Sequence, residues 1–198
     1  MAGTAKAYSS NNLIIGPGDS WGSLAVPGAG ARITLHTDGT PDSTANASAK
    51  HVGFTDKGAK VTYTNEIETF EADEQTAPIL SRILTESLTI DGAFLQGADL
   101  DIMDMFIMGA DKTTGSGYEA ITLGGNTAVT GMSFALIVPT VADATKFHVY
   151  NIYNAYNKKG VEVDVTRRDI AKIPFEMTGL QVSSRAVGDR LGCIWKSV

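Results

Sequence analysis

The sequence predicts a mainly β fold, an antiparallel β-sandwich or half-barrel with one short α-helix packed against it and long loops. Three observations lead to this prediction. Apolar and polar residues alternate in many short segments, Gly and Pro turns separate these segments, and a single segment has helical spacing behind a capping residue. The sequence shows no internal repeat and no linker, so we expect one domain over residues 1–198.

The composition limits the classes of function. A hydrophobic fraction of 43% suits a globular protein with a core, and a net charge of −6 argues against an electrostatic binder of nucleic acid. Cys193 is the single cysteine, which excludes an internal disulfide, and its apolar neighbours indicate a small buried thiol. The start of the chain lacks the pattern of a signal peptide, and no apolar run approaches the ~20 residues that span a bilayer. We therefore expect a protein made in a cytoplasm, with no membrane partner.

The N-terminal quarter reads as short strands and loops. Residues 1–12 are small and polar, which predicts a flexible arm, and residues 13–15 and 33–36 are each expected to be briefly extended. The segment 37–50 contains no large apolar side chain, so it is expected to be a long exposed loop that cannot anchor itself in a core. A loop of this length is usually functional or ordered by a partner.

A long two-stranded segment, residues 51–96, is the centre of the prediction. Val61, Tyr63 and Ile67 alternate with Thr and Glu, a polar break follows at 71–75, and a second strand runs over 81–90. Such alternation predicts an antiparallel pair with one dry and one wet face.

One charged residue stands out in this pair, because alternation places Glu86 on the apolar side with Leu84 and Leu88. An ionised group there is costly unless it is paired, so we expect an Arg or Lys partner from a neighbouring chain. Arg167 and Arg168 are further candidates for charge contacts between subunits.

The predicted helix covers residues 100–108, with Asp99 as N-cap, Asp101 in the first turn and Gly109 as the terminating residue. Helical spacing predicts a face that packs on a sheet, made of Leu100, Met103, Phe106 and Ile107. Residues 109–127 are Gly-rich and are expected to form a second long loop with a brief strand inside it.

Strands return in the C-terminal third. Alternation predicts them at 132–139, 147–156, 161–165, 171–177 and 191–195, with a turn at 157–160 between the second and the third.

No set of residues predicts catalysis or metal binding. His36, His51 and His148 lie on separate expected strands without a carboxylate pattern around them. The acidic residues around the helix start fit capping better than a calcium loop, and the Gly pairs at 115–117 and 124–125 do not follow a strand and open a helix as a phosphate loop must. We expect no enzyme, no cofactor and no metal.

The segment GFTDKGAKVTYTNEIETFEADEQTAPILSRILTESLTIDGAFLQ (residues 53–96) resembles the major tail tube proteins of long-tailed bacteriophages. The likeness consists of a Gly before a long Thr/Glu-rich strand, an acidic turn at 71–78, a strand at 82–90 and a short helix at 99–108. The segment 173–177 is similar to the final sheet strand of that family. The resemblance covers residues 50–110 well and 145–180 loosely.

The resemblance implies a structural virion protein that self-assembles into stacked hexameric rings, the tube of the phage tail. The partners it implies are other copies of the chain and other tail proteins (tape measure, terminator and distal tail), with DNA in transit and not specifically bound. A Thr- and Glu-rich lining would repel phosphate and let DNA slide. The lumen-lining candidates are Thr62, Thr64, Glu66, Glu68, Thr85, Ser87 and Thr89.

Contact between rings is assigned to the loop 37–50, whose candidate residues are Asp38, Asp42, Asn46 and Lys50. Deletion of residues 42–49 is expected to leave a folded monomer that forms no tubes.

Three alternatives stay open. The polar face of the central pair is, in a plain sandwich, simply the outer solvated face. The chain is otherwise another tail or connector ring of similar fold. The third alternative is a monomeric β-sandwich ligand-binding module, for which Tyr150, Tyr153 and Tyr156 would supply an aromatic cluster.

Overall fold

The computed structural model describes residues 18–28, 30–53, 55–70, 77, 79–95, 99–141, 143–163 and 172–197. The strands in these ranges are β1 (Asp19–Leu24), β2 (Lys50–His51), β3 (Thr55–Phe70), β4 (Leu80–Phe94), β5 (Asp111–Gly115), β6 (Tyr118–Thr122), β7 (Met132–Pro139), β8 (Phe147–Asn157), β9 (Ile173–Gly179) and β10 (Gly192–Lys196), and the helix is α1 (Leu100–Phe106).

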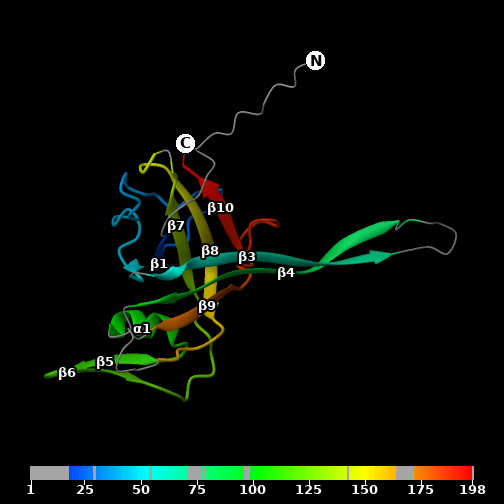
Figure 1. The fold of residues 1–198 in the computed structure, drawn as a ribbon. Helices are drawn as coiled ribbons and strands as arrows, with labels where there is room; N and C mark the ends of the chain where they lie inside the picture. The colour runs from blue at the N-terminus through cyan, green and yellow to red at the C-terminus, as the bar shows by residue number, and fades with distance from the viewer. Residues whose placement is uncertain are drawn as a thin grey trace.

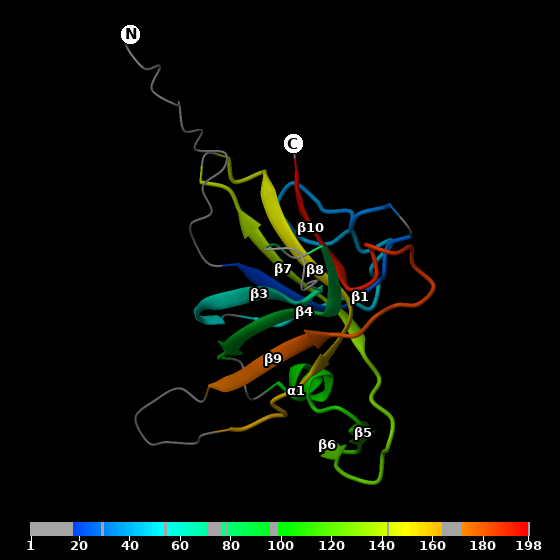
Figure 2. The same cartoon turned by 90° about the vertical axis from the view of Figure 1, so that its right-hand side faces the viewer.

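The strands confirm the predicted fold class, a mainly β half-barrel with one short helix among the described residues (Figures 1 and 2). An eight-stranded antiparallel sheet has the order β2-β1-β7-β8-β9-β4-β3, and β10 pairs with β8 beside this path. Strands β5 and β6 form a separate two-stranded sheet. In the described part of the chain, α1 is too short to cross a bilayer.

The helix closes the larger core of the half-barrel. Asp99 caps it, because its side chain accepts a hydrogen bond from the backbone N–H of Asp101. The Phe106 ring stacks on Phe94 at 4.8 Å between centroids and lies 5.4 Å from the Phe175 ring. Aromatic side chains from β4, β9 and the helix therefore hold α1 against the sheet.

The predicted packing face of the helix is confirmed for Phe106, which is buried, and for Met103, which is partly buried against the larger core, but not for Leu100 and Ile107. The residues that the helix buries are Ile102, Met105 and Phe106, whereas Leu100 and Ile107 are half-buried. The helix ends at Phe106, and Ile107 has an extended backbone with φ −91° and ψ 96°. Because Ile107 lies outside the helix, the helical spacing that placed it on the sheet does not apply.

The other face of the sheet carries a second, smaller core. Strand β7 is buried on both sides, with Phe134 and Leu136 facing the larger core and Ala135 and Ile137 facing the smaller one. The residues that cover this second face come from the segment between β1 and β2, including Ile33 and partly buried Leu35 and Ala49.

The prediction that residues 37–50 cannot anchor themselves is wrong. Asn46 is buried, its amide accepts a hydrogen bond from the backbone N–H of Ala25 (3.1 Å) and donates one to the carbonyl of Asp42 (3.0 Å). Pro41 forms an isolated β-bridge with Leu35. Apart from this bridge, the strand expected at residues 33–36 is not formed. Besides the packing of Ala49 on the second core, the loop is fixed by polar contacts, which a search for large apolar side chains does not detect.

The brief strand predicted inside the Gly-rich segment 109–127 corresponds to β6, but the segment also contains a second strand, β5, that was not predicted. It contains the β5–β6 hairpin, in which Lys112 pairs with Ile121 and Gly115 with Tyr118. Gly117 has φ +86° and closes the two-residue turn between the strands.

The other strand predictions are confirmed to within a few residues, with one exception. Residues 161–163 are not in a strand. The rest of that predicted strand, the arm 1–12, the extended segment 13–15, the turn at 71–75, and Arg167 and Arg168 all lie outside the described residues.

Candidate functional site

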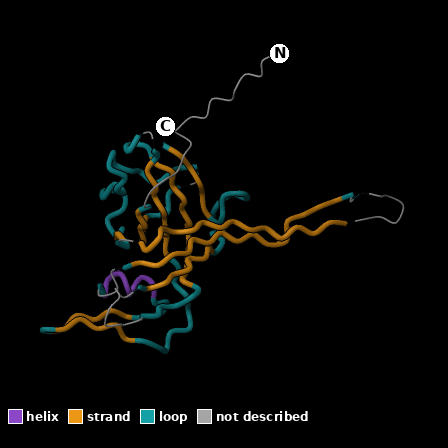
Figure 3. Tube along the Cα trace, in the orientation of Figure 1, coloured by secondary structure: helices purple, strands orange, loops and turns teal. Residues whose placement is uncertain are grey.

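A two-stranded ribbon, formed by β3 and β4, projects from the half-barrel (Figures 1 and 3). Its inner part belongs to the body, because Leu88 and Ile90 are buried in the larger core and Val61 packs against it. Its outer part, residues 63–70 and 80–86, is exposed at almost every position. The ribbon therefore leaves the body about midway along each strand.

The wet face of the ribbon brings the predicted lumen-lining residues together. The cross-strand pairs are Thr62 with Thr89, Thr64 with Ser87 and Glu66 with Thr85. The Thr85 hydroxyl donates a hydrogen bond to Glu66 Oε2 at 3.2 Å, and Glu68 lies 3.4 Å from Nε of Arg82. This face lies opposite the core side chains Leu88 and Ile90, and in the single chain it is solvated. The lumen role of the seven residues stays a prediction.

A register shift interrupts the ribbon between Glu66 and Ile67. Glu66 pairs with Thr85, but Ile67 pairs with Ile83, so Leu84 is an extra residue in β4 without a partner of its own. This β-bulge breaks the period of two beyond Thr85, so strict alternation does not extend to the outer end of β4.

The outer part of the ribbon exposes a set of large apolar side chains on the single chain. Ile67 is 54% exposed and its cross-strand partner Ile83 is 51% exposed. The full set in the described residues is Tyr63, Ile67, Phe70, Ile79, Leu80, Ile83 and Leu84. Tyr63, Ile67 and Ile83 belong to the face predicted to be dry, which is thus buried only at its inner end. The Phe70–Leu80 pair lies on the other face, together with the Glu68–Arg82 pair.

Glu86 has a partner within the chain. The Tyr63 hydroxyl donates a hydrogen bond to Glu86 Oε1 at 2.6 Å, and this bond raises the pKa of Tyr63 above its usual value. Glu86 pairs across the ribbon with Asn65, on the same face as the Tyr63–Leu88 pair. A hydroxyl replaces the cation that was expected, and a contact from a neighbouring chain stays a prediction.

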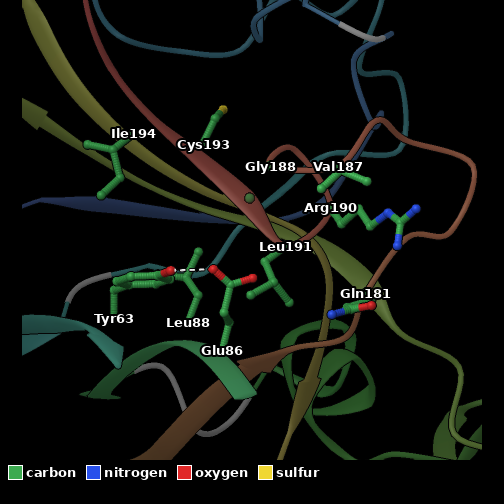
Figure 4. Close-up of a pocket in the computed structure, with 11 residues that line it drawn as sticks. Tyr63, Glu86, Leu88, Gln181, Val187, Gly188, Arg190, Leu191, Cys193 and Ile194 are labelled. Carbon is green, nitrogen blue, oxygen red and sulfur yellow. Dashed lines mark hydrogen bonds between the residues drawn. The ribbon is translucent and has the colours of Figure 1, made fainter. Parts of the chain in front are cut away.

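A hollow of about 460 Å³ lies where the ribbon meets the C-terminal segment (Figure 4). The ribbon supplies Tyr63, Glu86 and Leu88 to its wall. The residues that line it from the other side are Gln181, Val187, Gly188, Arg190, Leu191, Gly192, Cys193 and Ile194. Its wall is mainly apolar, with a few polar groups, which is the usual composition of a binding site.

The position of this C-terminal segment depends on Arg185, a residue that the sequence did not single out. Arg185 is 7% exposed, and its guanidinium lies 3.8 Å from the centroid of the Tyr153 ring and 2.7 Å from Asp189 Oδ2. It also donates hydrogen bonds to the carbonyls of Pro27 and Gly28, which precede the loop over the second core. We name this group the Arg185 clamp: Arg185, Tyr153, Asp189 and the two carbonyls.

The clamp shifts the acid–base behaviour of its members. The hydrogen bond from the Tyr153 hydroxyl, at 2.7 Å, and the Arg185 guanidinium lower the pKa of Asp189. Burial, followed by hydrogen bonding to Cys193 and Asp189, raises the pKa of Tyr153 far above its usual range. Both groups therefore keep the protonation state that the clamp requires over the physiological pH range. No local sequence pattern predicts the clamp, because its members come from three separate parts of the chain: the loop that follows β1, strand β8 and the segment before β10.

The residues proposed for ring-to-ring contact have different environments. Asp38 is exposed, Asp42 is half-buried and Asn46 is buried. Lys50 lies 3.2 Å from Asp101 at the start of α1, and Lys112 of β5 lies 2.8 Å from the same carboxylate. Hydrogen bonds from Lys112 and Lys50 lower the pKa of Asp101. Asp38 is thus the most accessible of the four candidates, whereas Lys50 already has a partner in the chain.

The histidines are spread over the fold. His51 packs beside Trp21 with 4.9 Å between ring centroids, and its Nε2 lies 3.4 Å from Asp19. His148 is half-buried on β8 and His36 is exposed. Within the described ranges, no three His, Cys, Asp or Glu side chains lie close enough together to hold a metal ion.

The projecting ribbon, its bare apolar side chains and the hollow at its base are the features of the structure that a functional assignment has to explain. The chain matches no protein-family model, and no curated protein sequence matches it.

Proposed function

We propose that this chain is the structural subunit of a bacteriophage tail tube, whose copies assemble into stacked hexameric rings around a passage for DNA. The observation that carries the proposal is the projecting ribbon, whose outer part exposes apolar side chains on the single chain. A two-stranded ribbon is marginally stable by itself in water and needs further packing. Association with other copies supplies that packing.

Burial of the exposed side chains would supply much of the free energy that association requires. Burying an Ile or Leu side chain fully contributes ~1.5–3 kcal/mol, so a side chain that is half-exposed has about 1 kcal/mol still to gain. Seven such residues approach the cost of association, which is about 4–15 kcal/mol. Any backbone hydrogen bonds formed at the outer edge of β3, which ends the sheet order, add to this gain.

The wet face of the ribbon suits the wall of a DNA passage. It carries Thr side chains together with Glu66 and Glu68, and the whole chain has a net charge of −6. Carboxylates repel phosphate, and hydroxyls keep the surface hydrated without attracting the DNA backbone. The location that this role implies is the virion tail, and the partners are copies of the chain and the neighbouring tail proteins. The role is structural and involves no catalysis.

Electron microscopy of the purified protein over a range of concentrations tests the proposal. Open-ended tubes of stacked rings are expected. Single closed rings that do not stack would favour a connector, and monomers at every concentration would contradict self-assembly. The alternative of a ligand-binding module has less support, because Tyr153, the middle residue of its expected aromatic cluster, is buried in the Arg185 clamp.

A further inference from the structure

We propose that the hollow at the ribbon base binds a small zwitterionic ligand with an apolar body, whose ammonium group pairs with Glu86 and whose carboxylate pairs with Arg190. Every group involved belongs to one chain, so the site does not depend on assembly into tubes. Two opposite charges line the same hollow, and the chain holds each of them in place without neutralising it.

Glu86 lines the hollow with a carboxylate that is only half used. Its Oε1 accepts the hydrogen bond from the Tyr63 hydroxyl at 2.6 Å, whereas its Oε2 has no hydrogen-bond partner among the described residues. The bond fixes the orientation of the carboxylate, and Tyr63 itself also lines the hollow (Figure 4). A carboxylate together with an aromatic ring suits an ammonium group, because the ion pair and the cation–π attraction act together.

Arg190 lines the hollow from the C-terminal segment with a guanidinium that is also only partly used. Its Nε donates a hydrogen bond to the carbonyl of Arg185 at 3.2 Å, and the Arg185 clamp fixes that residue in turn. In the part of the chain that the structure describes, the two terminal nitrogens of Arg190 have neither a hydrogen-bond partner nor a carboxylate within ion-pair distance. A guanidinium that is held at Nε and free at both terminal nitrogens presents a fork that matches a carboxylate.

The two charges lie near each other but do not pair. The ribbon touches the C-terminal segment where Leu88 meets Gly192, since a Cβ added to Gly192 would lie 2.7 Å from the Leu88 side chain. Glu86 and Arg190 are each two residues from this contact, which is about 7 Å along an extended chain. In Figure 4, Leu191 lies between them. A short ligand can therefore reach both charges at once.

The wall between the two charges is apolar. Leu88, Leu191 and Ile194 supply it, and the volume of about 460 Å³ is within the usual range for small-molecule sites. An anion alone would face the carboxylate of Glu86, and a cation alone would face the guanidinium of Arg190. A ligand with an ammonium group at one end, a carboxylate at the other and aliphatic groups between them complements the whole wall. Short apolar peptides with free termini have this chemistry.

Ligand-observed NMR with leucyl-leucine and the dilute wild-type protein tests the site. At an ordinary affinity per atom, we expect a Kd of about 1 mM or lower. Acetylation of the ammonium group and amidation of the carboxylate should each weaken binding by about 2–5-fold, the range for an ion pair in contact with water. Diglycine carries both charges without the apolar body, and it should bind at least about 5-fold more weakly than leucyl-leucine.

Two variants assign the charges. In Glu86→Gln, acetylation of the peptide should no longer weaken binding, whereas amidation should act as in the wild type. In Arg190→Met, this pattern should be reversed. Glu66→Gln is the matched control, because Glu66 lies on the opposite face of the ribbon from Glu86, and it should behave like the wild type.

Two results would overturn the site. One is the absence of leucyl-leucine binding to the wild-type protein. The other is binding in which acetylation and amidation have the same effect on the wild type and on both hollow variants. Neither result bears on the tail-tube proposal, which depends on assembly and is tested by electron microscopy.

Discussion

Replacing Arg185 with Met tests how much of the fold depends on the clamp. Met keeps the apolar length of the side chain but removes the ion pair to Asp189, the contact with the Tyr153 ring and three hydrogen bonds to backbone carbonyls. Removing one partner of a buried ion pair costs about 3–5 kcal/mol. Asp189 is partly exposed and regains water, so we expect a loss of about 3 kcal/mol in the free energy of unfolding.

The assay is equilibrium unfolding in urea at pH 7, followed by tryptophan fluorescence. Arg185→Lys keeps the charge but cannot reproduce the planar fork, so its expected loss is roughly half as large. Arg190→Met is the matched control, because Arg190 is half-buried in the same segment and lacks the ion pair; its expected loss is below about 1 kcal/mol. A value for Arg185→Met within about 0.5 kcal/mol of the wild type would refute the reasoning.

The same variant has a signature in acid. Because the folded pKa of Asp189 is lowered, its contribution to stability is complete above the unfolded value of about 3.9 and is lost as the pH falls through the folded value. Part of that lowering comes from Arg185. The difference in unfolding free energy between wild type and Arg185→Met should therefore be constant near neutral pH and shrink below about pH 4. A difference that stays constant down to pH 3 would contradict the ion pair.

Two further predictions concern the two cores. Asn157→Ala should lower the free energy of unfolding by about 2–3 kcal/mol, because the buried amide donates a hydrogen bond to the carbonyl of Phe106 at the end of α1 (3.1 Å). Unfolding in denaturant measures this loss. An unchanged unfolding midpoint would contradict the role of the amide. Gly39→Ala should lower the melting temperature, because Gly39 has φ +85° and an added Cβ would lie 2.7 Å from the Phe147 ring. Gly28→Ala is the control: an added Cβ there meets open space, so its melting temperature should equal that of the wild type within experimental error.

The sequence located the strands of the sheet well. Alternation located β8 and β9 to within a few residues because their buried residues alternate with half-buried ones. The apolar segment of β7 was also located, although this strand is buried on both sides. Alternation also predicted the dry face of the ribbon, but the pattern does not say what covers an apolar face. Leu88 is covered by the body, whereas Ile67 on the same face is bare.

The features that escaped prediction are fixed by single polar contacts or by small local irregularities. Asn46 anchors its loop through its amide, and Arg185 holds its segment through a guanidinium, so neither shows as an apolar pattern. The helix ends two residues early at Phe106, so Ile107 falls outside the helical spacing. The extra residue Leu84 shifts one register. Such features depend on contacts between distant segments, which periodicity does not encode.

The extra residue in β4 has a consequence for the unassembled protein. An apolar ribbon that is flat and exposed is a template for cross-β stacking, the structure of amyloid. A β-bulge increases the local right-handed twist, and the ribbon is visibly coiled along its length (Figure 1). Twisted ribbons stack poorly, and the Glu68–Arg82 pair places charges beside the apolar positions in the manner of gatekeeper residues. The twist that the bulge adds therefore disfavours stacking of exposed ribbons into fibrils.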